Sequence, residues 1–510
     1  MKHHAITLTA LVLILSPRAA LAACADLAQL VLPATSITTA SVVAAGTFKT
    51  GGGPPAAQAA YASLPEFCRV AATLRPSADS DIKIEVWLPT AQWNGRLQAV
   101  GNGGWAGNVP YTAMAAALAG GYATAGTDTG HTGGTAAFAV GHPEKVIDMG
   151  YRAVHEMTVQ AKAIINSFYG RAPQFSIWNG CSTGGRQGMT AAVRYPNDFD
   201  AVIAGAPAVN WMNLHAGRMA ANRAANRSEA AVIPADKYAL VHNAVLAACD
   251  ANDGVKDGII ENPLSCRFEP RVLQCSGADT SSCLTTAQVE TVRGMYSPVL
   301  DPRTGQAVLP GLALGSEPAW ATAAGARPVS TALDAFRYLV FENANWDPAT
   351  FNASTDIERL LRADRNDVLN SSSTDLKAFF DRGGKLLMYH GWSDTQVTPL
   401  NSIDYFQKLV ARFGPQAVGR SVQLYMVPGM YHCSGGPGTD VFNRVAAMEQ
   451  WLLAGTAPER IPASRVTNGV VDRTRPLCPF GRVARWTGSG STDDRANFAC
   501  VAADPILPPP

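Results

Sequence analysis

The feature that most constrains this chain is the pentapeptide at 180–184, Gly-Cys-Ser-Thr-Gly, which follows the pattern Gly-x-Ser-x-Gly. An apolar stretch at 175–178 precedes it, and a segment with helical spacing follows at 185–194. In this context the pattern predicts a tight strand-to-helix turn that exposes Ser182 at the end of a strand. The flanking glycines leave room for such a turn.

A cysteine adjoins this serine, and another adjoins a histidine far downstream. Cys181 directly precedes Ser182, and Cys433 directly follows His432. A bond between the two cysteines would hold the serine and the histidine close together, which is the arrangement that a serine hydrolase needs. We therefore hypothesise that Cys181 pairs with Cys433. The alternative is that both are unrelated structural cysteines.

Length and composition limit the classes of protein that the chain can be. It has 510 residues, 47% of them hydrophobic and 16% charged, so a sizeable core is expected and disorder is not. The length suits one large α/β domain with an inserted domain. The net charge of +1 argues against a nucleic-acid partner or an anionic membrane surface.

The N-terminus resembles a secretory signal. A basic start at Lys2 leads into an apolar run at 5–15 and a small-residue cleavage site at 20–22, so we expect residues 1–22 to be removed. The run is too short to span a bilayer, and no later stretch is long enough to do so. We expect a secreted or periplasmic protein. Residues 21–24 also resemble a lipobox, in which case Cys24 would carry a lipid anchor.

The cysteine count supports export. Ten cysteines in an exported chain predict five disulfides, although the sequence alone allows many pairings. Proximity favours Cys249–Cys266, Cys275–Cys283 and Cys478–Cys500, which leaves Cys24, Cys68, Cys181 and Cys433. No Cys-x-x-Cys pair is present, so zinc is a poor explanation for them.

Strand-like and helix-like segments alternate on both sides of a long interruption. Residues 24–80 are interpreted as short strands and loops. The alternation predicts a mostly parallel sheet and an α/β-hydrolase fold with a large inserted lid. We expect a catalytic domain in two parts, 23–207 and 371–510, around a lid at 208–370, and a frayed tail at 508–510. The expected strands are 82–88, 97–100, 122–126, 175–178, 201–204, 385–389 and 422–427, and the expected helices are 149–168, 185–194, 375–382, 401–413 and 441–453.

The order of residues along the chain suggests which groups would activate the serine. In this fold an acid and then a histidine follow the nucleophile. His432 lies in a glycine-rich loop after a predicted strand, and Asp394 lies in the loop after the preceding one. His390 is interpreted as a hydrogen-bonded histidine near the core. Two rival acids, Asp381 and Asp404, fall on predicted helices and are expected to be solvated.

An oxyanion hole needs two convergent backbone N–H groups. Thr183, which directly follows the serine, is expected to supply one of them. The other should come from an earlier loop at a strand end, and Gly-Asn-Gly-Gly at 101–104 has that position. The alternative for this loop is an ordinary turn.

The loop at 250–259 has the composition of a calcium site. Asp250, Asp253 and Asp257 lie close together, with glycines that allow tight turns, and Cys249 and Cys266 flank the loop. Hard cations prefer several carboxylate and carbonyl oxygens. The loop lacks the terminal glutamate of an EF-hand, and the alternative is an acidic surface turn.

Taken together, Gly-Cys-Ser-Thr-Gly-Gly at 180–185, Asp394 and His-Cys at 432–433 resemble the tannase and feruloyl esterase family. The resemblance covers nearly the whole mature chain, including the motifs at 93–96, 100–104, 128–131, 148–151, 427–430 and 475–479. It implies that the Cys181–Cys433 disulfide lies under the active site and that Cys24 is a structural cysteine. The remaining residues that it implies are Gly104 and Thr183 as oxyanion donors, and Asp250, Asp253, Val255, Asp257 and Ile259 as calcium ligands, with Val255 and Ile259 binding through carbonyls.

The resemblance also implies an activity. We expect a secreted serine esterase that cleaves hydroxycinnamate or similar aromatic esters, those derived from plant cell walls among them, through an acyl-enzyme formed on Ser182. Structural Ca²⁺ is expected, and no organic cofactor. Galloyl esters and terephthalate monoesters are the alternative substrates. A calcium-stabilised exported binding protein that has lost catalysis is the alternative outside the enzymes.

Overall fold

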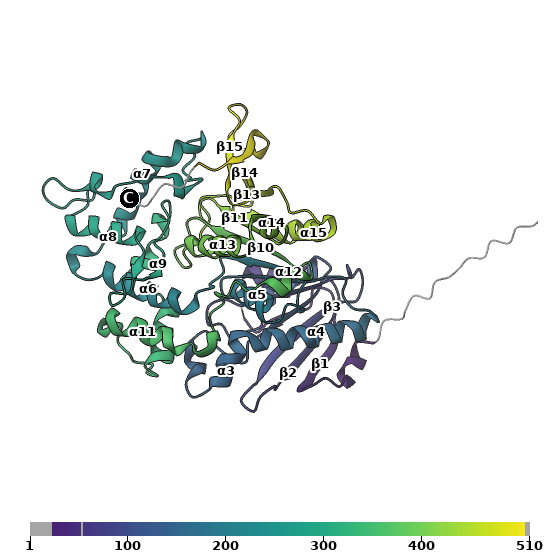
Figure 1. Ribbon diagram of the computed structural model, residues 1–510. Helices are drawn as coiled ribbons and strands as arrows, with labels where there is room; N and C mark the ends of the chain where they lie inside the picture. Colours follow the sequence, from purple (N-terminus) through teal and green to yellow (C-terminus); the bar gives the residue numbers. More distant parts are fainter. Residues whose placement is uncertain (1–22, 53–54, 505–510) are drawn as a thin grey trace, which may run out of the picture.

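The computed structural model describes residues 23–52 and 55–504 (Figure 1). The expected signal at 1–22 and the tail at 508–510 therefore lie outside the described residues. A nine-stranded mixed sheet forms the centre of the molecule. Its strands, in spatial order, are β1 (Thr35–Val43), β2 (Phe67–Leu74), β3 (Ile82–Pro89), β5 (Ala123–Thr127), β4 (Leu97–Val100), β6 (Ser176–Cys181), β7 (Ala201–Gly205), β10 (Lys385–Gly391) and β11 (Val422–Val427).

The half of the sheet that carries β4 to β11 is parallel. β4, β6, β7, β10 and β11 pair in parallel, and β5 joins β4 in the same direction. β3 is antiparallel to both β2 and β5, and β1 is antiparallel to β2. The seven predicted strands are confirmed to within a few residues, and the arrangement is that of the predicted α/β-hydrolase fold.

The expectation for residues 24–80 is only partly confirmed. Helix α1 (Pro55–Ala62) lies where only strands and loops were expected, and β1 is nine residues long rather than short. β1 is an edge strand with no buried residue, so its sequence lacks the apolar alternation that would have revealed its length.

Helices cover both faces of the sheet. On one face α4 (Ala153–Tyr169), α5 (Thr183–Arg194), α12 (Lys377–Asp381) and α13 (Pro399–Phe413) share a core with the strands. On the other face lie α1, α2 (Tyr111–Ala119) and α15 (Arg444–Ala454). The helix predicted from residue 441 starts three residues later, because Val441–Phe442 forms the short strand β12 against β13. The remaining helices of this part are α3 (Pro143–Ile147) and α14 (Pro415–Ser421).

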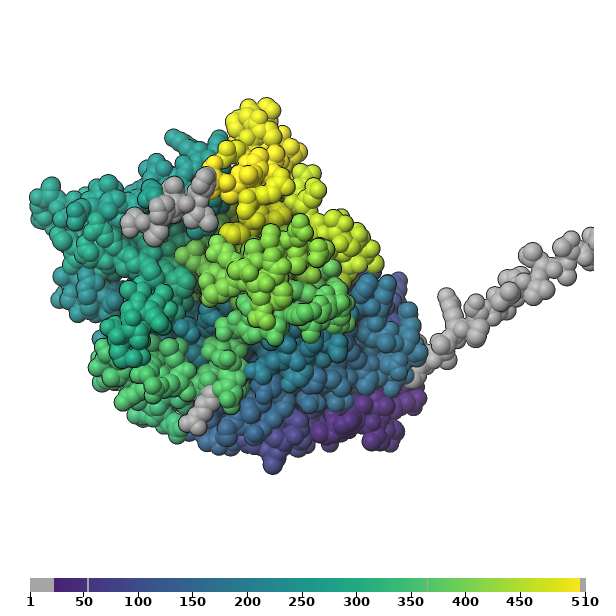
Figure 2. All heavy atoms as spheres, in the orientation of Figure 1, coloured from purple at the N-terminus to yellow at the C-terminus, as the bar shows by residue number. Residues whose placement is uncertain are grey.

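A long helical segment lies between β7 and β10. Figure 1 shows it as a lobe beside the sheet, and Figure 2 shows its teal to green atoms on the left side of the molecule. Its ends meet, because the backbone N–H of Ser371 donates to the carbonyl of Val209 at 2.7 Å. The exact lid bounds of 208–370 stay a prediction. The segment contains α6 (Trp211–Ala225), α7 (Asp236–Cys249), α8 (Thr286–Tyr296), α9 (Ala321–Ala324), α10 (Ser330–Asp334), α11 (Ala353–Ala363) and the hairpin of β8 (Val299–Leu300) and β9 (Ala307–Leu309).

The C-terminal region adds two small antiparallel sheets that the sequence pattern did not predict. One consists of β12, β13 (Ile461–Thr467) and β14 (Val470–Leu477), and the other of β15 (Arg482–Trp486) and β16 (Phe498–Ala502). In Figure 1 the yellow strands β13 to β15 stand above the parallel half of the sheet.

All ten cysteines form disulfides, and the pairing agrees with the sequence hypothesis. Cys24 bonds to Cys68, so its sulfur has no valence left for a lipid thioether. Cys181 bonds to Cys433, and the three pairs favoured by proximity are also present. Among residues 23–52 and 55–504, no helix has both the length and the hydrophobicity needed to cross a bilayer.

Candidate active site

Ser182 lies in the tight turn between β6 and α5, as the sequence predicts. Its backbone has φ 62° and ψ −123°, a conformation that residues other than glycine rarely adopt. Its N–H donates a hydrogen bond to the carbonyl of Gly205 at 2.9 Å. A Cβ on Gly180 would lie 2.5 Å from the backbone of Gly184, so the turn cannot close with a larger residue at position 180. The strain is therefore held by packing on both sides of the serine.

Asp394 and His432 come from loops that follow β10 and β11, the next strands of the parallel half. His432 Nδ1 lies 2.7 Å from Asp394 Oδ2, where it donates a hydrogen bond. Asp394 is fully buried, and the His432 side chain is 14% exposed. The pair thus has one protected partner and one that can reach a substrate.

The Cys181–Cys433 disulfide joins the serine turn to the histidine loop. Its Cα atoms are 6.0 Å apart, and Ser182 and His432 line one cavity of about 350 Å³. The structure contains no direct hydrogen bond between the Ser182 hydroxyl and the imidazole. Such contacts often tighten only when substrate binds.

Asp394 is held by four hydrogen bonds. Its Oδ1 accepts from the backbone N–H of Gln396 at 2.7 Å and of Val397 at 3.0 Å. Its Oδ2 faces both His432 and His390. Burial alone would raise the pKa of Asp394, but the charge of His432 and the hydrogen bonds from both histidines lower it well below its usual range. The carboxylate is therefore ionised in the folded protein near neutral pH.

His390 is buried, as expected, but it also contacts the acid, which sequence reasoning missed. Its Nε2 lies 2.8 Å from the carbonyl of Val397 and 3.2 Å from Asp394 Oδ2. Since a carbonyl only accepts, Nε2 carries a proton, and Nδ1 is 2.8 Å from the hydroxyl of Ser402. The sequence feature that could have indicated this contact is the position of His390 at the end of β10, four residues before Asp394.

The two expected oxyanion donors lie beside the serine. Thr183 Oγ1 donates to the carbonyl of Gly104 at 2.9 Å, which fixes the loop after β4 against the start of α5. Both residues line the cavity, and neither backbone N–H donates to another described residue. Two free N–H groups next to a serine can stabilise a developing oxyanion.

The opposite wall of the cavity comes from the lid. Trp211, Leu214, His215 and Arg218 project from α6, and Thr331 comes from α10. Sequence reasoning missed these residues. Their successive spacings of three, one and three residues place them on one helical face, but the same spacing is typical of any packed helix.

This arrangement agrees with comparison to known proteins. The family model described as tannase and feruloyl esterase matches residues 68–501. The chain belongs to the tannase and feruloyl esterase family. It is therefore a carboxylic ester hydrolase, and the alternative of a non-catalytic binding protein gains no support.

Relatives of this esterase cover most of its length. An uncharacterized esterase of Xanthomonas campestris pv. campestris is 39% identical, over 97% of this chain and 94% of that protein. The mono(2-hydroxyethyl) terephthalate hydrolase of Piscinibacter sakaiensis is 34% identical, over 88% and 86%. The crystal structure of feruloyl esterase B from Aspergillus oryzae superposes with a TM-score of 0.86 at 31% identity, over 94% and 99% of the two chains.

The acidic loop of the esterase partly fits a calcium ion. Asp253 is buried, and burial together with the charges of Asp257 and Asp250 raises its pKa to about 6. Asp257 Oδ1 is buried without a hydrogen-bond partner among the described residues, and Oδ2 accepts from Arg475 at 2.7 Å. Crowded carboxylates and an unpaired oxygen suit a divalent cation.

The carboxylates of this loop do not already converge on one point. Asp250 instead accepts hydrogen bonds from the backbone N–H groups of Asp257 and Gly258. Within the described residues, the one close cluster of His, Cys, Asp or Glu groups is Cys275, Asp279 and Cys283, whose sulfurs form a disulfide. Calcium binding by the esterase therefore stays a prediction.

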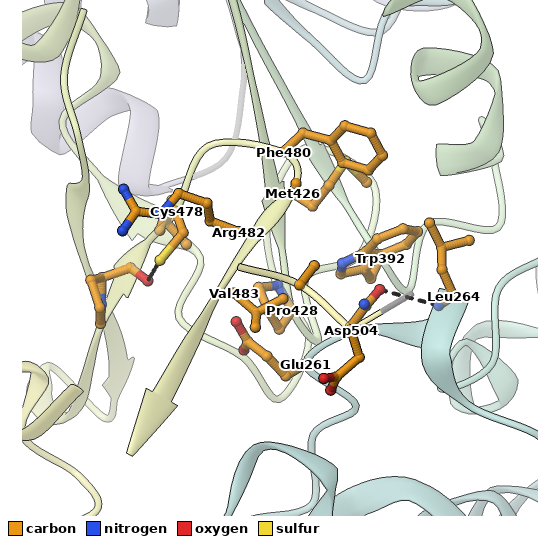
Figure 3. Close-up of a pocket in the computed structure, with 15 residues that line it drawn as sticks. Glu261, Leu264, Trp392, Met426, Pro428, Cys478, Phe480, Arg482, Val483 and Asp504 are labelled. Atoms are coloured by element: carbon orange, nitrogen blue, oxygen red, sulfur yellow. Dashed lines mark hydrogen bonds between the residues drawn. The ribbon is translucent and has the colours of Figure 1, made fainter. Parts of the chain in front are cut away.

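A second cavity, of about 250 Å³, lies between the C-terminal hairpin and the loop after the acidic segment (Figure 3). Trp392, Met426 and Phe480 form much of its apolar wall, and Glu261 contributes a carboxylate. Burial raises the pKa of Glu261 to about 8. This cavity shares no lining residue with the one at Ser182, so it takes no direct part in the chemistry there.

Proposed function

We propose that this protein is an exported serine esterase that cleaves esters of aromatic acids, with hydroxycinnamate (feruloyl-type) esters as its reference substrates. One observation carries the proposal. A strained serine, a histidine bonded to a buried carboxylate, and two free backbone N–H groups line the same cavity. The feruloyl esterases among its relatives support the substrate class.

In the first half of the reaction, the hydroxyl oxygen of Ser182 attacks the ester carbonyl carbon, and its proton passes to Nε2 of His432. Asp394 Oδ2 keeps the proton of the imidazole on Nδ1 and stabilises the imidazolium. The N–H groups of Gly104 and Thr183 bind the oxyanion. When the intermediate collapses, the alcohol leaves with the proton from His432, and the acid part stays on Ser182 as an ester.

In the second half, water replaces the alcohol. His432 takes a proton from water as it attacks the acyl-enzyme, and then returns that proton to the Ser182 oxygen. The aromatic acid is released. The apolar surface of Trp211 and Leu214 on the lid side of the cavity suits an aromatic acyl group.

Calcium would have a structural role in this proposal. Asp250, Asp253 and Asp257, with the carbonyls of Val255 and Ile259, would hold the ion, which neutralises their mutual repulsion. The loop lies outside the catalytic cavity, and no organic cofactor enters the proposed reaction.

Export fits the cysteine chemistry. Five disulfides among residues 24–500 require an oxidising compartment in most organisms. The proposed signal at 1–22 would deliver the chain to the periplasm or the medium.

A hydrolysis panel tests the proposal. Methyl ferulate, methyl gallate and the 2-hydroxyethyl monoester of terephthalic acid are offered to the wild type and to Ser182→Ala. We expect hydrolysis by the wild type and none by Ser182→Ala, at an almost unchanged melting temperature. Ser282→Ala, in an exposed lid loop, is the matched control. Activity retained by Ser182→Ala would refute the assignment.

The same panel ranks the alternatives. The 34% identical terephthalate monoester hydrolase makes that substrate the second candidate. Faster turnover of the monoester than of methyl ferulate would favour it, and faster turnover of methyl gallate would favour a tannase.

A further inference from the structure

The loop that carries Asp394 is bound to the lid through its hydroxyl groups. This acid loop, residues 392–398, connects β10 to α13. Its three hydroxyl side chains are buried, and each donates a hydrogen bond to a backbone carbonyl of the lid segment 311–322. The three bonds are Ser393 Oγ to Gly315 at 2.9 Å, Thr395 Oγ1 to Ala319 at 3.2 Å, and Thr398 Oγ1 to Gly311 at 2.7 Å. Because buried hydroxyls need partners, the position of the acid loop depends on this segment.

Ser393 connects the lid segment to both catalytic loops. It directly precedes Asp394, and its backbone N–H donates to the carbonyl of Met430 at 3.0 Å, in the loop that carries His432. Its hydroxyl binds Gly315, whose φ of 93° favours glycine over any other residue. A displacement of Gly315 would therefore move the residue that adjoins the catalytic acid.

Glu317 holds Gly315 in place. Its side chain is completely buried, and its Oε1 accepts from the backbone N–H of Gly315 and from the hydroxyl of Tyr296, both at 2.8 Å. His242 Nδ1 donates to Oε2 at 2.7 Å. Since Tyr296 belongs to α8 and His242 to α7, one carboxylate joins the segment to two helices of the lid. Hydrogen bonds to a carboxylate are stronger than those between neutral groups, so this junction is firm.

Glu317 makes these contacts outside the catalytic cavity. Neither its side chain nor any of the three hydroxyls lines the cavity at Ser182. Two other residues of the acid loop, Gln396 and Val397, do line it, and their backbone N–H groups bind Asp394. Glu317 can therefore affect the reaction only through the position of the acid loop, and not by contact with a substrate.

We propose that Glu317 is a positioning residue for the catalytic acid. It fixes Gly315, Gly315 fixes Ser393, and this series of hydrogen bonds holds Asp394 where His432 can bind it. The inference rests on the proposed function and adds a role for the lid. The lid then determines the rate of turnover as well as covering the substrate.

Two substitutions of Glu317 test the proposal, on the ester that the wild type hydrolyses fastest. Glu317→Ala removes both acceptor oxygens, so kcat should fall by about tenfold or more while KM changes by less than about twofold. Glu317→Gln keeps one oxygen for Gly315 and Tyr296, and its amide nitrogen can donate to Nδ1 of a neutral His242. It should therefore recover most of the lost kcat.

Removal of the hydroxyls tests the same contacts without changing the lid. The double variant Ser393→Ala/Thr398→Val should also lower kcat, by about threefold or more, at nearly constant KM. Thr291→Val is the matched control, because Thr291 is buried within the lid and donates to the carbonyl of Ala231 at 2.8 Å. It should lower the melting temperature and leave kcat unchanged. Should Glu317→Ala not fold, as judged by its melting temperature, the double variant provides the test.

The rate of labelling by a fluorophosphonate separates this inference from the proposed function, because the probe needs a working base but no matching ester. We expect Glu317→Ala to be labelled more slowly than the wild type, in proportion to its kcat. An unlabelled wild type refutes the proposed function, and the inference with it. A labelled wild type that hydrolyses none of the esters refutes the substrate class alone, and the labelling rates of the variants still decide the inference.

Three results would overturn the inference while the proposed function stands. The first is a folded Glu317→Ala that keeps the kcat and the labelling rate of the wild type. The second is a loss confined to KM. The third is a double variant that loses no more kcat than Thr291→Val.

Discussion

At the scale of single residues, the site depends on one carboxylate shared by two histidines. Asp394 Oδ2 accepts from His432 and His390, and the two backbone N–H groups on Oδ1 leave the carboxylate little freedom to rotate. His390 does not reach the cavity, so it acts through Asp394. It is a positioning residue for the base.

Replacement of His390 tests this role. His390→Leu removes the Nε2–H donor and leaves part of a buried charge unpaired, so we expect kcat to fall by about tenfold or more with little change in KM. His390→Gln, which keeps a donor, should restore much of that loss. The measurement is kcat and KM across a pH series. Equal losses in both variants, or a change confined to KM, would mean that His390 only fills space.

The triad could be predicted from the sequence because each member follows a strand of the parallel half, in the order that the fold imposes. His390 and Glu317 could not be assigned in this way. His390 lies within an apolar strand, and Glu317 on a short helical turn of the lid, so the sequence around each is the same as that of a structural residue. Only the hydrogen bonds that connect them to Asp394 and to its loop distinguish them.

At the scale of elements, the Cys181–Cys433 disulfide connects two turns that are 252 positions apart in sequence. Its removal frees the loop with His432 from the turn with Ser182. Since misplacing a catalytic group by about 1 Å costs on the order of 100-fold in rate, the double variant Cys181→Ala/Cys433→Ala should lose at least that much kcat/KM while still folded.

The matched control removes a disulfide of the lid, in Cys275→Ala/Cys283→Ala. This bond closes a loop of only 8 positions, so its loss should cost about 2.5 kcal/mol of stability, less than loss of the longer bridge, and little activity. Rates and melting temperatures are measured for both double variants. If both lose activity in proportion to stability, the catalytic bridge has no positional role.

The loop after β5 should make stability depend on pH. Asp128 is buried, and burial raises its pKa to about 6, although the N–H groups of Gly130 and Lys83 oppose this. Because the folded pKa lies above the unfolded value, the contribution of Asp128 to stability is present in full below about pH 4 and is lost as the pH rises through about 6.

Asp128→Asn keeps an acceptor oxygen and removes this titration. Relative to the wild type, the variant should therefore become more stable between pH 4 and pH 8, by about 3 kcal/mol at most. Melting temperatures of both proteins across this range provide the test. A constant difference between them would show that Asp128 titrates normally in the folded state.

The sequence predicted most accurately the bounds of the strands whose side chains are buried on both faces of the sheet. β7, β10 and β11 are apolar runs buried on both faces, and each was expected within two residues of its bounds. The exposed side chains of β13 and β14 and the edge position of β1 leave no such pattern. Their pairing depends on contacts between distant segments, which local sequence does not record.

At the scale of the whole molecule, the acidic loop connects the lid to the C-terminal sheets. Arg473 and Arg475 on β14 reach Asp257 at 3.2 and 2.7 Å. If Ca²⁺ binds only the folded protein, a chelator should lower the melting temperature, and added Ca²⁺ at about 100 times its Kd should restore roughly 2.7 kcal/mol.

Substitution of one predicted calcium ligand tests whether the ion binds in this loop. Asp250→Asn should abolish the shift caused by Ca²⁺, whereas Asp279→Asn, in the lid outside this loop, should retain it. Melting curves with and without chelator decide between them. A shift that survives in Asp250→Asn would place the ion elsewhere.

We propose that this fold activates one particular serine, Ser182. A fluorophosphonate probe reacts only with a serine that has a working base and oxyanion hole, so labelling followed by peptide mapping gives the most direct test. We predict a single adduct on the peptide that contains Ser182, and none in His432→Ala. An adduct on another residue, or an unlabelled wild type, would show that Ser182 is not the nucleophile.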